Sequence, residues 1–257
     1  MKKTSLDVTI YLVVFSAIQI IVSFGAALSS IFALKADDPK VLMALSATAS
    51  IITLLIFLWR KWTPVGKTYI QSKPWATLAW SGVAAIGVVI PSVWLQEQMP
   101  ALPDTAGDTL QKIISAPGGY FVIALLAPVV EEVVFRGAIL RALLSSMQSK
   151  WGAICISAAL FALIHFNPAQ TPHAFLMGLR MGWLYMRAGS IVPGVVFHWA
   201  NNTVAYLIAV AYPGDETKLV DIFGGNETAV IMSVVFSLCI FIPALFQLNI
   251  WTKKRGR

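Results

Sequence analysis

The chain has 257 residues, of which 58% are hydrophobic and only 12% are charged, and its mean hydropathy is +0.75. Soluble domains carry about 25% charged residues, so this composition cannot cover a water-exposed surface and excludes a soluble globular protein. The net charge of +7 and the pI near 9.5 do not indicate nucleic acid, because the basic residues lie at the ends of apolar blocks, as topology signals do.

Apolar blocks long enough to cross a bilayer, which needs about 20 residues per helix, follow one another along the chain. We predict an all-α polytopic membrane protein with about eight transmembrane helices in a compact bundle, forming a single integral membrane domain over residues 1–257. The predicted spans are roughly 8–34, 41–59, 75–95, 119–147, 151–166, 172–187, 190–211 and 229–250. Brief turns join spans four to seven, which should therefore pack as antiparallel neighbours.

The lysine and arginine residues predict how these spans are oriented. With the N-terminus in the cytoplasm, fourteen of them lie on the cytoplasmic side and four on the opposite side, which satisfies the positive-inside rule. The cytoplasmic set is Lys2, Lys3, Arg60, Lys61, Lys67, Lys73, Arg141, Lys150, Arg180, Arg187, Lys253, Lys254, Arg255 and Arg257, and the opposite set is Lys35, Lys40, Lys112 and Lys218. An even number of spans puts both termini in the cytoplasm, and a bacterial inner membrane is the expected location.

The fourth span holds three charged side chains, Glu131, Glu132 and Arg136, in an otherwise apolar sequence. An ionisable residue in mid-membrane costs about 2.5–3.5 kcal/mol on insertion scales, so such residues are candidates for function. Glu132 and Arg136 are four residues apart and can pair on one helix face, whereas Glu131 is rotated by about 100° and can face a cavity. The structural alternative is that both glutamates only neutralise Arg136. Pro128 removes a backbone hydrogen bond and predicts a kink, which either serves packing or lets water reach a site.

Spans five and seven add two histidines and an asparagine. His165 lies near the end of the fifth span, with Phe161 one turn back on the same face. His198 and Asn202 are four residues apart in the seventh span and therefore share a helix face, while Asn201 is predicted to turn away from them toward a neighbouring helix. The structural alternatives are an interfacial position for His165 and interhelical hydrogen bonds for His198 and Asn202.

Other residues of the spans are interpreted as structural. His173, at the start of the sixth span, is predicted to be interfacial. Gly178 and Gly182 have the small-xxx-small spacing that lets two helices pack closely. Cys155 and Cys239 lie inside apolar blocks and outside any CxxC pair, which predicts small packing residues rather than a disulfide or a metal site.

A carboxylate, two imidazoles and an amide in neighbouring spans can hydrolyse a bond with activated water. A glutamate desolvated in a helix bundle becomes a competent general base, and a polar pair facing it can hold a carbonyl oxygen as negative charge develops. No serine lies in a GxSxG sequence and neither cysteine is near these groups, which disfavours covalent catalysis. No cofactor is favoured; the alternative is a divalent metal such as zinc held by Glu131, His165 and His198, although the chain lacks an HExxH sequence.

The polar residues form three motifs in a fixed order. These are EExxxR at Glu131, Glu132 and Arg136, FxxxH at Phe161 and His165, and HxxxN at His198 and Asn202. Together they resemble the CAAX-protease and bacteriocin-processing family of intramembrane peptidases, which includes the type II CAAX prenyl endopeptidases. The stretch GLRMGWLYMRAGSIVPGVVFH is also similar to the sequence that leads into the family's last motif. The resemblance covers about residues 115–210, which we interpret as the catalytic core.

The resemblance implies a role for each motif residue. Glu131 and His165 would activate the hydrolytic water, and His198 and Asn202 would stabilise the oxyanion. The residues in supporting roles would be Glu132, Arg136 and Phe161. Because the family has also been described as metalloproteases, the resemblance leaves the use of a metal open.

We therefore predict an intramembrane endopeptidase that cuts a membrane-associated protein or peptide, with that substrate and the lipid bilayer as its partners and no nucleic acid. Family members are linked to the maturation of secreted peptides, bacteriocin immunity and stress signalling, and some act as scaffolds, so a non-catalytic membrane adaptor or immunity factor is the alternative. A transporter with the buried glutamates as a proton relay is a third hypothesis, disfavoured by the absence of two matching half-repeats with broken helices.

Overall fold

The structure, a computed structural model, describes residues 2–29, 37–213 and 217–253, and every regular element in these ranges is a helix, as predicted. The long helices are α1 (Lys2–Ser29), α2 (Pro39–Trp59), α4 (Trp75–Glu97), α8 (Lys150–Leu163), α9 (Thr171–Ala188), α10 (Val192–Ala211) and α12 (Glu227–Lys253). The fourth predicted span consists of four consecutive segments, η2 (Phe121–Leu126), α6 (Ala127–Glu131), η3 (Glu132–Leu140) and α7 (Arg141–Ser146). Short helices α3 (Thr68–Gln71), α5 (Gly107–Ser115) and α11 (Leu219–Ile222) lie between the spans.

Five of the described helices are long and apolar enough to cross a membrane, which supports an integral membrane protein. They are Thr4–Val22 of α1, α2, α4, α10 and Glu227–Thr252 of α12. Helix α8 has only 14 residues, and α9 includes Arg180 and Arg187, which lower its hydropathy. The end of the first predicted span, residues 30–34, lies outside the described residues.

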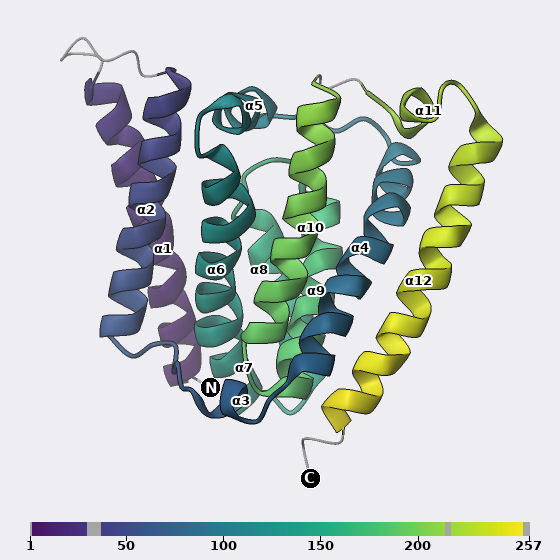
Figure 1. The fold of residues 1–257 in the computed structure, drawn as a ribbon. Helices are drawn as coiled ribbons and strands as arrows, with labels where there is room; N and C mark the ends of the chain where they lie inside the picture. Colours follow the sequence, from purple (N-terminus) through teal and green to yellow (C-terminus); the bar gives the residue numbers. More distant parts are fainter. Residues whose placement is uncertain (1, 30–36, 214–216, 254–257) are drawn as a thin grey trace.

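The helices run across the molecule with alternating direction, so their ends form two opposite faces. One face carries α3, the start of α1 and the end of α12, while the other carries α5 and α11 (Figure 1). The two ends of the described chain therefore lie on the same face, as expected for an even number of spans. Lys35, Lys254, Arg255 and Arg257, which contributed to the predicted orientation, are outside the described residues.

Segment η2 is π-helical, with hydrogen bonds from residue i to residue i−5, and this register frees a carbonyl group. The Ala127 N–H donates to the carbonyl of Val122. In the same register the carbonyl of Ile123 would need the N–H of residue 128, which is proline and has none. The side chain of Asn202 supplies the donor, with Nδ2 3.1 Å from the Ile123 oxygen. The disruption predicted at Pro128 thus takes the form of a π-helical segment capped from α10.

Two further carbonyl groups of η3 accept side-chain hydrogen bonds. The hydroxyl of Thr63 donates to the carbonyl of Val133 at 2.6 Å, and the hydroxyl of Ser157 donates to the carbonyl of Phe135 at 3.1 Å. Because lipid offers no hydrogen-bond partners, side chains have to satisfy a backbone that departs from the α-helical register. These contacts fix the helix that carries the glutamates against its neighbours.

Helices α8 and α9 pack closely through glycine, as the small-xxx-small spacing predicted. A Cβ on Gly178 would lie 2.8 Å from the Cβ of Ala158, so only glycine allows this approach. The interpretation of Cys155 and Cys239 as packing residues was wrong. Both are free thiols, as expected, but both are exposed on the outer surfaces of α8 and α12.

The loop after α4 is tied to the turn between α8 and α9. The buried side chain of Asn167 donates to Asp104 Oδ1 at 2.8 Å, and its oxygen accepts from the Thr105 N–H at 3.3 Å. The Gln96 amide also donates to the carbonyl of Ala169 at 3.0 Å. These bonds hold the turn that follows the end of α8.

The hydrogen bonds that the Asp104 carboxylate accepts predict a pH-dependent contribution to stability. Burial alone would raise the pKa of Asp104, but hydrogen bonds from the Ala106 N–H, the Asn167 amide and the Gly107 N–H lower that pKa below its usual range. The stabilisation is therefore present above the unfolded-state pKa, about 3.9, and is lost as the pH falls through the folded-state value. We expect the midpoint of thermal unfolding in detergent to fall more steeply between about pH 5 and pH 3 in the wild type than in Asp104→Asn. Identical pH profiles of the wild type and Asp104→Asn would refute this role of the Asp104 carboxylate.

Candidate active site

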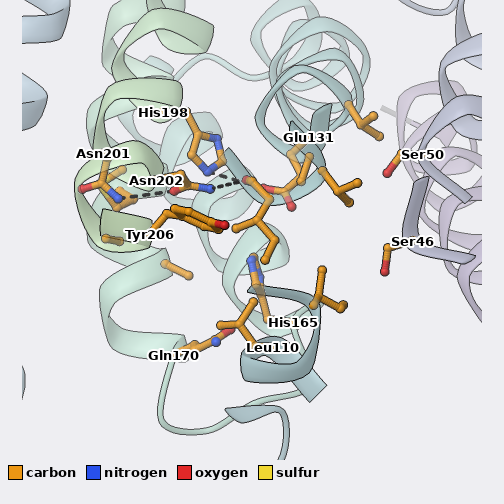
Figure 2. Close-up of a pocket in the computed structure, with 18 of the residues that line it drawn as sticks. Ser46, Ser50, Leu110, Glu131, His165, Gln170, His198, Asn201, Asn202 and Tyr206 are labelled. Atoms are coloured by element: carbon orange, nitrogen blue, oxygen red, sulfur yellow. Dashed lines mark hydrogen bonds and ion pairs between the residues drawn. The ribbon is translucent and has the colours of Figure 1, made fainter. Parts of the chain in front are cut away.

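The predicted site residues line one cavity of about 590 Å³ inside the helix bundle. Glu131, His165, His198 and Asn202 all contribute to its wall. Figure 2 shows the carboxylate of Glu131 beside the ring of His198, with Asn202 next to them and His165 in the same pocket. The remaining wall is mostly apolar and comes from α1, α2 and α5 as well as from the motif helices, through residues that include Phe15, Ser46, Ser50 and Leu110.

The two adjacent glutamates lie in different environments. The side chain of Glu132 is completely buried and its Oε1 lies 2.8 Å from Arg136 Nη1, which confirms the predicted pairing at four-residue spacing. The side chain of Glu131 is 22% exposed and lines the cavity. Because consecutive helical residues are rotated by about 100°, one carboxylate balances the buried arginine while its neighbour is free to meet a ligand.

His198 lies between the two carboxylates, a contact that the motif spacing alone did not predict. Its Nε2 is 3.6 Å from Glu131 Oε2, and its Nδ1 is 3.5 Å from Glu132 Oε1. The side chain is almost fully buried. An unbroken row of charged and polar groups thus leads from Arg136 through Glu132 and His198 to Glu131.

Phe161 is the apolar partner of these groups. Its ring centroid lies 4.4 Å from the guanidinium carbon of Arg136, 5.0 Å from the ring of His165 and 5.9 Å from the ring of His198. Arg136 Nη2 is also 3.4 Å from the carbonyl of Gly178. A buried cation over an aromatic face is stabilised by the ring quadrupole, so Phe161 fixes the arginine and both histidine rings relative to one another.

The ring of His165, in the turn after α8, is oriented by the last turn of that helix. Its Nδ1 lies 2.7 Å from the carbonyl oxygen of Phe161. In a neutral ring, a proton on Nδ1 that is donated to this carbonyl leaves Nε2 as an acceptor. The nitrogen that remains can therefore bind water in the cavity.

Asn202 has two partners, and its neighbour corrects a prediction. Its Nδ2 donates to Ile123, and its Oδ1 lies 3.4 Å from the Nδ2 of Asn201. Asn201 was predicted to turn away from the site, but it lines the same cavity. The reason is that Asn202 is held toward the free carbonyl of η2, which leaves room for both amides on the cavity side of α10.

His173 is a site residue that the sequence interpretation missed. It was predicted to be interfacial, yet it lines the cavity from the first turn of α9. The sequence did contain a signal for this position. Only residues 164–170 separate α8 from α9, and such a short turn between antiparallel helices brings the start of α9 next to His165 at the end of α8.

The start of α10 approaches Glu132 closely because residue 194 is glycine. A Cβ at this position would lie 2.5 Å from Glu132 Oε2. Two non-bonded atoms cannot approach this closely, so a larger residue must displace either the carboxylate or the helix. Gly194 therefore sets the depth at which α10 and His198 lie against the glutamates.

We expect Gly194→Ala to destabilise the protein by about 1–3 kcal/mol, the usual cost of overpacking a well-packed core, and to reduce activity by displacing Glu132 from His198. Equilibrium unfolding in detergent measures the first effect. Gly82→Ala is the matched control in helix α4, because its nearest neighbour would be Val196 Cγ1 at 4.0 Å, an ordinary contact. Equal stability of the two variants would show that the close approach of residue 194 to Glu132 does not restrict the size of the residue there.

The described residues that line the cavity do not form a metal-binding group. In the part of the chain that the structure describes, no three histidine, cysteine, aspartate or glutamate side chains form a group that could hold a metal ion. Glu131, His165 and His198, the three ligands considered for zinc, line one cavity without forming such a group. We therefore derive no catalytic step through a metal.

The fold and the site define an integral membrane protein with a carboxylate–imidazole–amide centre enclosed among its helices. Residues 114–204 match the family described as type II CAAX prenyl endopeptidase Rce1-like, which confirms the resemblance of the three motifs to that family. Searches of curated proteins and of solved structures gave no match. The family's description implies a protease, which is the class of activity that this match supports.

Proposed function

We propose that the protein is an intramembrane endopeptidase that hydrolyses a peptide bond of a membrane-associated protein or peptide. The observation that carries the proposal is the convergence of Glu131, His165, His198 and Asn202 on one cavity within a hydrophobic bundle. Carboxylates and imidazoles within membrane-spanning helices are costly to bury, which makes them candidates for function. A cavity inside the bundle with a base, an acceptor and amide donors is suited to the attack of water on a carbonyl group.

In this mechanism Glu131 and His165 bind the attacking water. The carboxylate of Glu131 takes one proton of the water while His165 Nε2, left as an acceptor by the bond of Nδ1 to Phe161, orients the other. The hydroxide that forms adds to the peptide carbonyl carbon. Glu131 then carries the proton that the leaving amine requires.

His198 and Asn202 stabilise the oxyanion of the tetrahedral intermediate. The Asn202 amide has a second N–H besides the one bound to Ile123. In the resting site Arg136 balances the charge of Glu132, and the ring of His198 lies between the two carboxylates, which lowers the cost of burying them. When Glu131 takes up its proton, its attraction for His198 Nε2 falls, and this N–H becomes available to the oxyanion.

We infer that the protein works in a bacterial inner membrane, with both termini in the cytoplasm, and that a metal is not required. The orientation follows from the distribution of lysine and arginine. The metal-free reaction follows from the roles given above to Glu131 and His165, both of which would be occupied as ligands in a zinc site.

Cleavage of a fluorogenic apolar peptide by the purified protein in detergent tests the proposal. We expect the wild type to cut the peptide, Glu131→Ala and His198→Ala to leave it intact, and a strong chelator to have no effect. Loss of activity in the chelator that zinc restores would establish the metal-dependent alternative. A protein whose cellular phenotype survives in both variants would act as an adaptor or immunity factor, and proton-coupled flux in vesicles without cleavage would indicate transport.

A further inference from the structure

The two faces of the molecule differ in charge. Apart from Asp7 and the two adjacent glutamates, Glu131 and Glu132, the described carboxylates lie on the face of α5 and α11 (Figure 1); they are Asp37, Asp38, Glu97, Asp104, Asp108, Asp221 and Glu227. The face of α3 carries Arg60, Lys61, Lys67, Lys73, Arg141, Lys150 and Arg187, whereas only Lys40, Lys112 and Lys218 are described on the acidic face. By the positive-inside rule the face of α3 is cytoplasmic and the face of α5 is extracytoplasmic.

The cavity extends from the glutamates toward the acidic face. Its wall includes residues 110, 113 and 114 of α5, His165 just after the end of α8, His173 in the first turn of α9, and positions 205, 206 and 209 near the end of α10. All of these belong to helix ends on the face of α5. None of the described lining residues belongs to α3 or α7, the helices of the basic face.

Toward the basic face the site is closed by a packed layer. The side chain of Phe135, next to Arg136, and those of Ala138, Ile139 and Leu140, which follow it along η3, are completely buried. Protein interiors at this packing leave no passage for water or a peptide. The η3 segment therefore separates Glu131 from the cytoplasmic side.

From these observations we infer that the active site is entered from the extracytoplasmic half of the membrane, and that the substrate is an apolar peptide segment at the outer leaflet. This inference rests on the proposed peptidase function. The apolar walls, including Leu110, Ile113 and Ile164, suit aliphatic side chains, while Gln19 and Ser50 can hydrogen-bond the exposed backbone of an unwound segment. A translocated peptide or the outer end of a membrane anchor has this chemistry, whereas a peptide that is confined to the cytoplasm does not reach the cavity.

Cysteine labelling tests the side of access without requiring proteolysis. In a Cys155→Ser, Cys239→Ser background, Ala205→Cys and Ala127→Cys place a thiol on the cavity wall, and Gln148→Cys places an exposed thiol between α7 and α8. With a membrane-impermeant maleimide, we expect the two cavity thiols to react in right-side-out vesicles and not in inside-out vesicles. Gln148→Cys should show the opposite pattern. Labelling of a cavity thiol from the same side as Gln148→Cys, or labelling of Gln148→Cys from outside, would overturn the inference.

A pair of membrane-anchored reporters tests the substrate class. Both carry one identical apolar segment, placed at the outer end of the anchor in the first and at the inner end in the second. We expect cleavage of the first alone, and cleavage of the second or of both would overturn the inference. If neither reporter is cut, the proteolytic function fails for this segment, while the labelling pattern still decides from which side the cavity is open.

Discussion

Glu131→Gln is expected to lower the rate of peptide cleavage by about a hundred- to ten-thousand-fold, the range that a positioned general base contributes. Glutamine has nearly the same shape as glutamate but cannot accept the proton of the attacking water. The side chain of Glu131 is partly exposed in the cavity and lies 3.6 Å from His198, with no part in the Arg136 ion pair. The fold should therefore survive, and steady-state cleavage of the fluorogenic peptide, together with thermal unfolding in detergent, measures both effects.

Glu227→Gln is the matched control for this experiment. It makes the same chemical change at an exposed carboxylate in the first turn of α12, outside the cavity. We expect this variant to keep the wild-type rate and the wild-type unfolding temperature. If Glu131→Gln also kept the wild-type rate, Glu131 could not be the base, and the assignment of the two glutamates would have to be abandoned.

The different environments of the two glutamates were predictable because they follow from their positions around the helix. Four-residue spacing places Glu132 beside Arg136, and a rotation of about 100° places Glu131 elsewhere, whatever surrounds the helix. The same argument places His198 and Asn202 on one face of α10. The spacing of residues along the sequence was therefore sufficient to predict contacts between side chains of the same helix.

Contacts between helices far apart in the sequence were not predictable in this way. Nothing in the first two spans indicates that Phe15 and Ser50 would line the same cavity as Glu131, since both lie in ordinary apolar stretches. The sequence predicted that His198 faces a carboxylate, but not that it lies between two. Its position between Glu131 and Glu132 depends on the close approach at Gly194. Tertiary packing decides such contacts, and a single sequence does not encode them in its spacing.

The π-helical register of the glutamate helix was also missed, because a 3.6-residue period was assumed throughout the fourth span. The physical cause is nevertheless present in the sequence. A proline at position 128 leaves one upstream carbonyl without a donor, and in the π register that carbonyl belongs to Ile123. Asn202 is the donor that satisfies it, so its position reflects a backbone requirement as well as chemistry.

Glu132→Ala is expected to destabilise the protein by about 3–5 kcal/mol, the usual cost of leaving one partner of a buried ion pair alone. Both side chains of the pair are at most 1% exposed, and Arg136 would keep its charge with only the ring of Phe161 and the carbonyl of Gly178 as partners. Equilibrium unfolding in detergent measures the loss. The same substitution at Glu131 should cost much less, because that carboxylate reaches the cavity. Equal losses at the two positions would contradict the distinction between a structural and a catalytic glutamate.

Removing both charges separates the structural contribution of the pair from its contribution to catalysis. In a double variant, Glu132→Met with Arg136→Met, no unpaired charge remains and the volume is roughly kept, so most of the lost stability should return. Cleavage should not return, because His198 Nδ1 loses the carboxylate that lies 3.5 Å away and the ring is no longer held for the oxyanion. A double variant that regained both stability and activity would mean that the pair serves the fold alone. A stable but inactive protein is the result that requires Glu132 to act through His198.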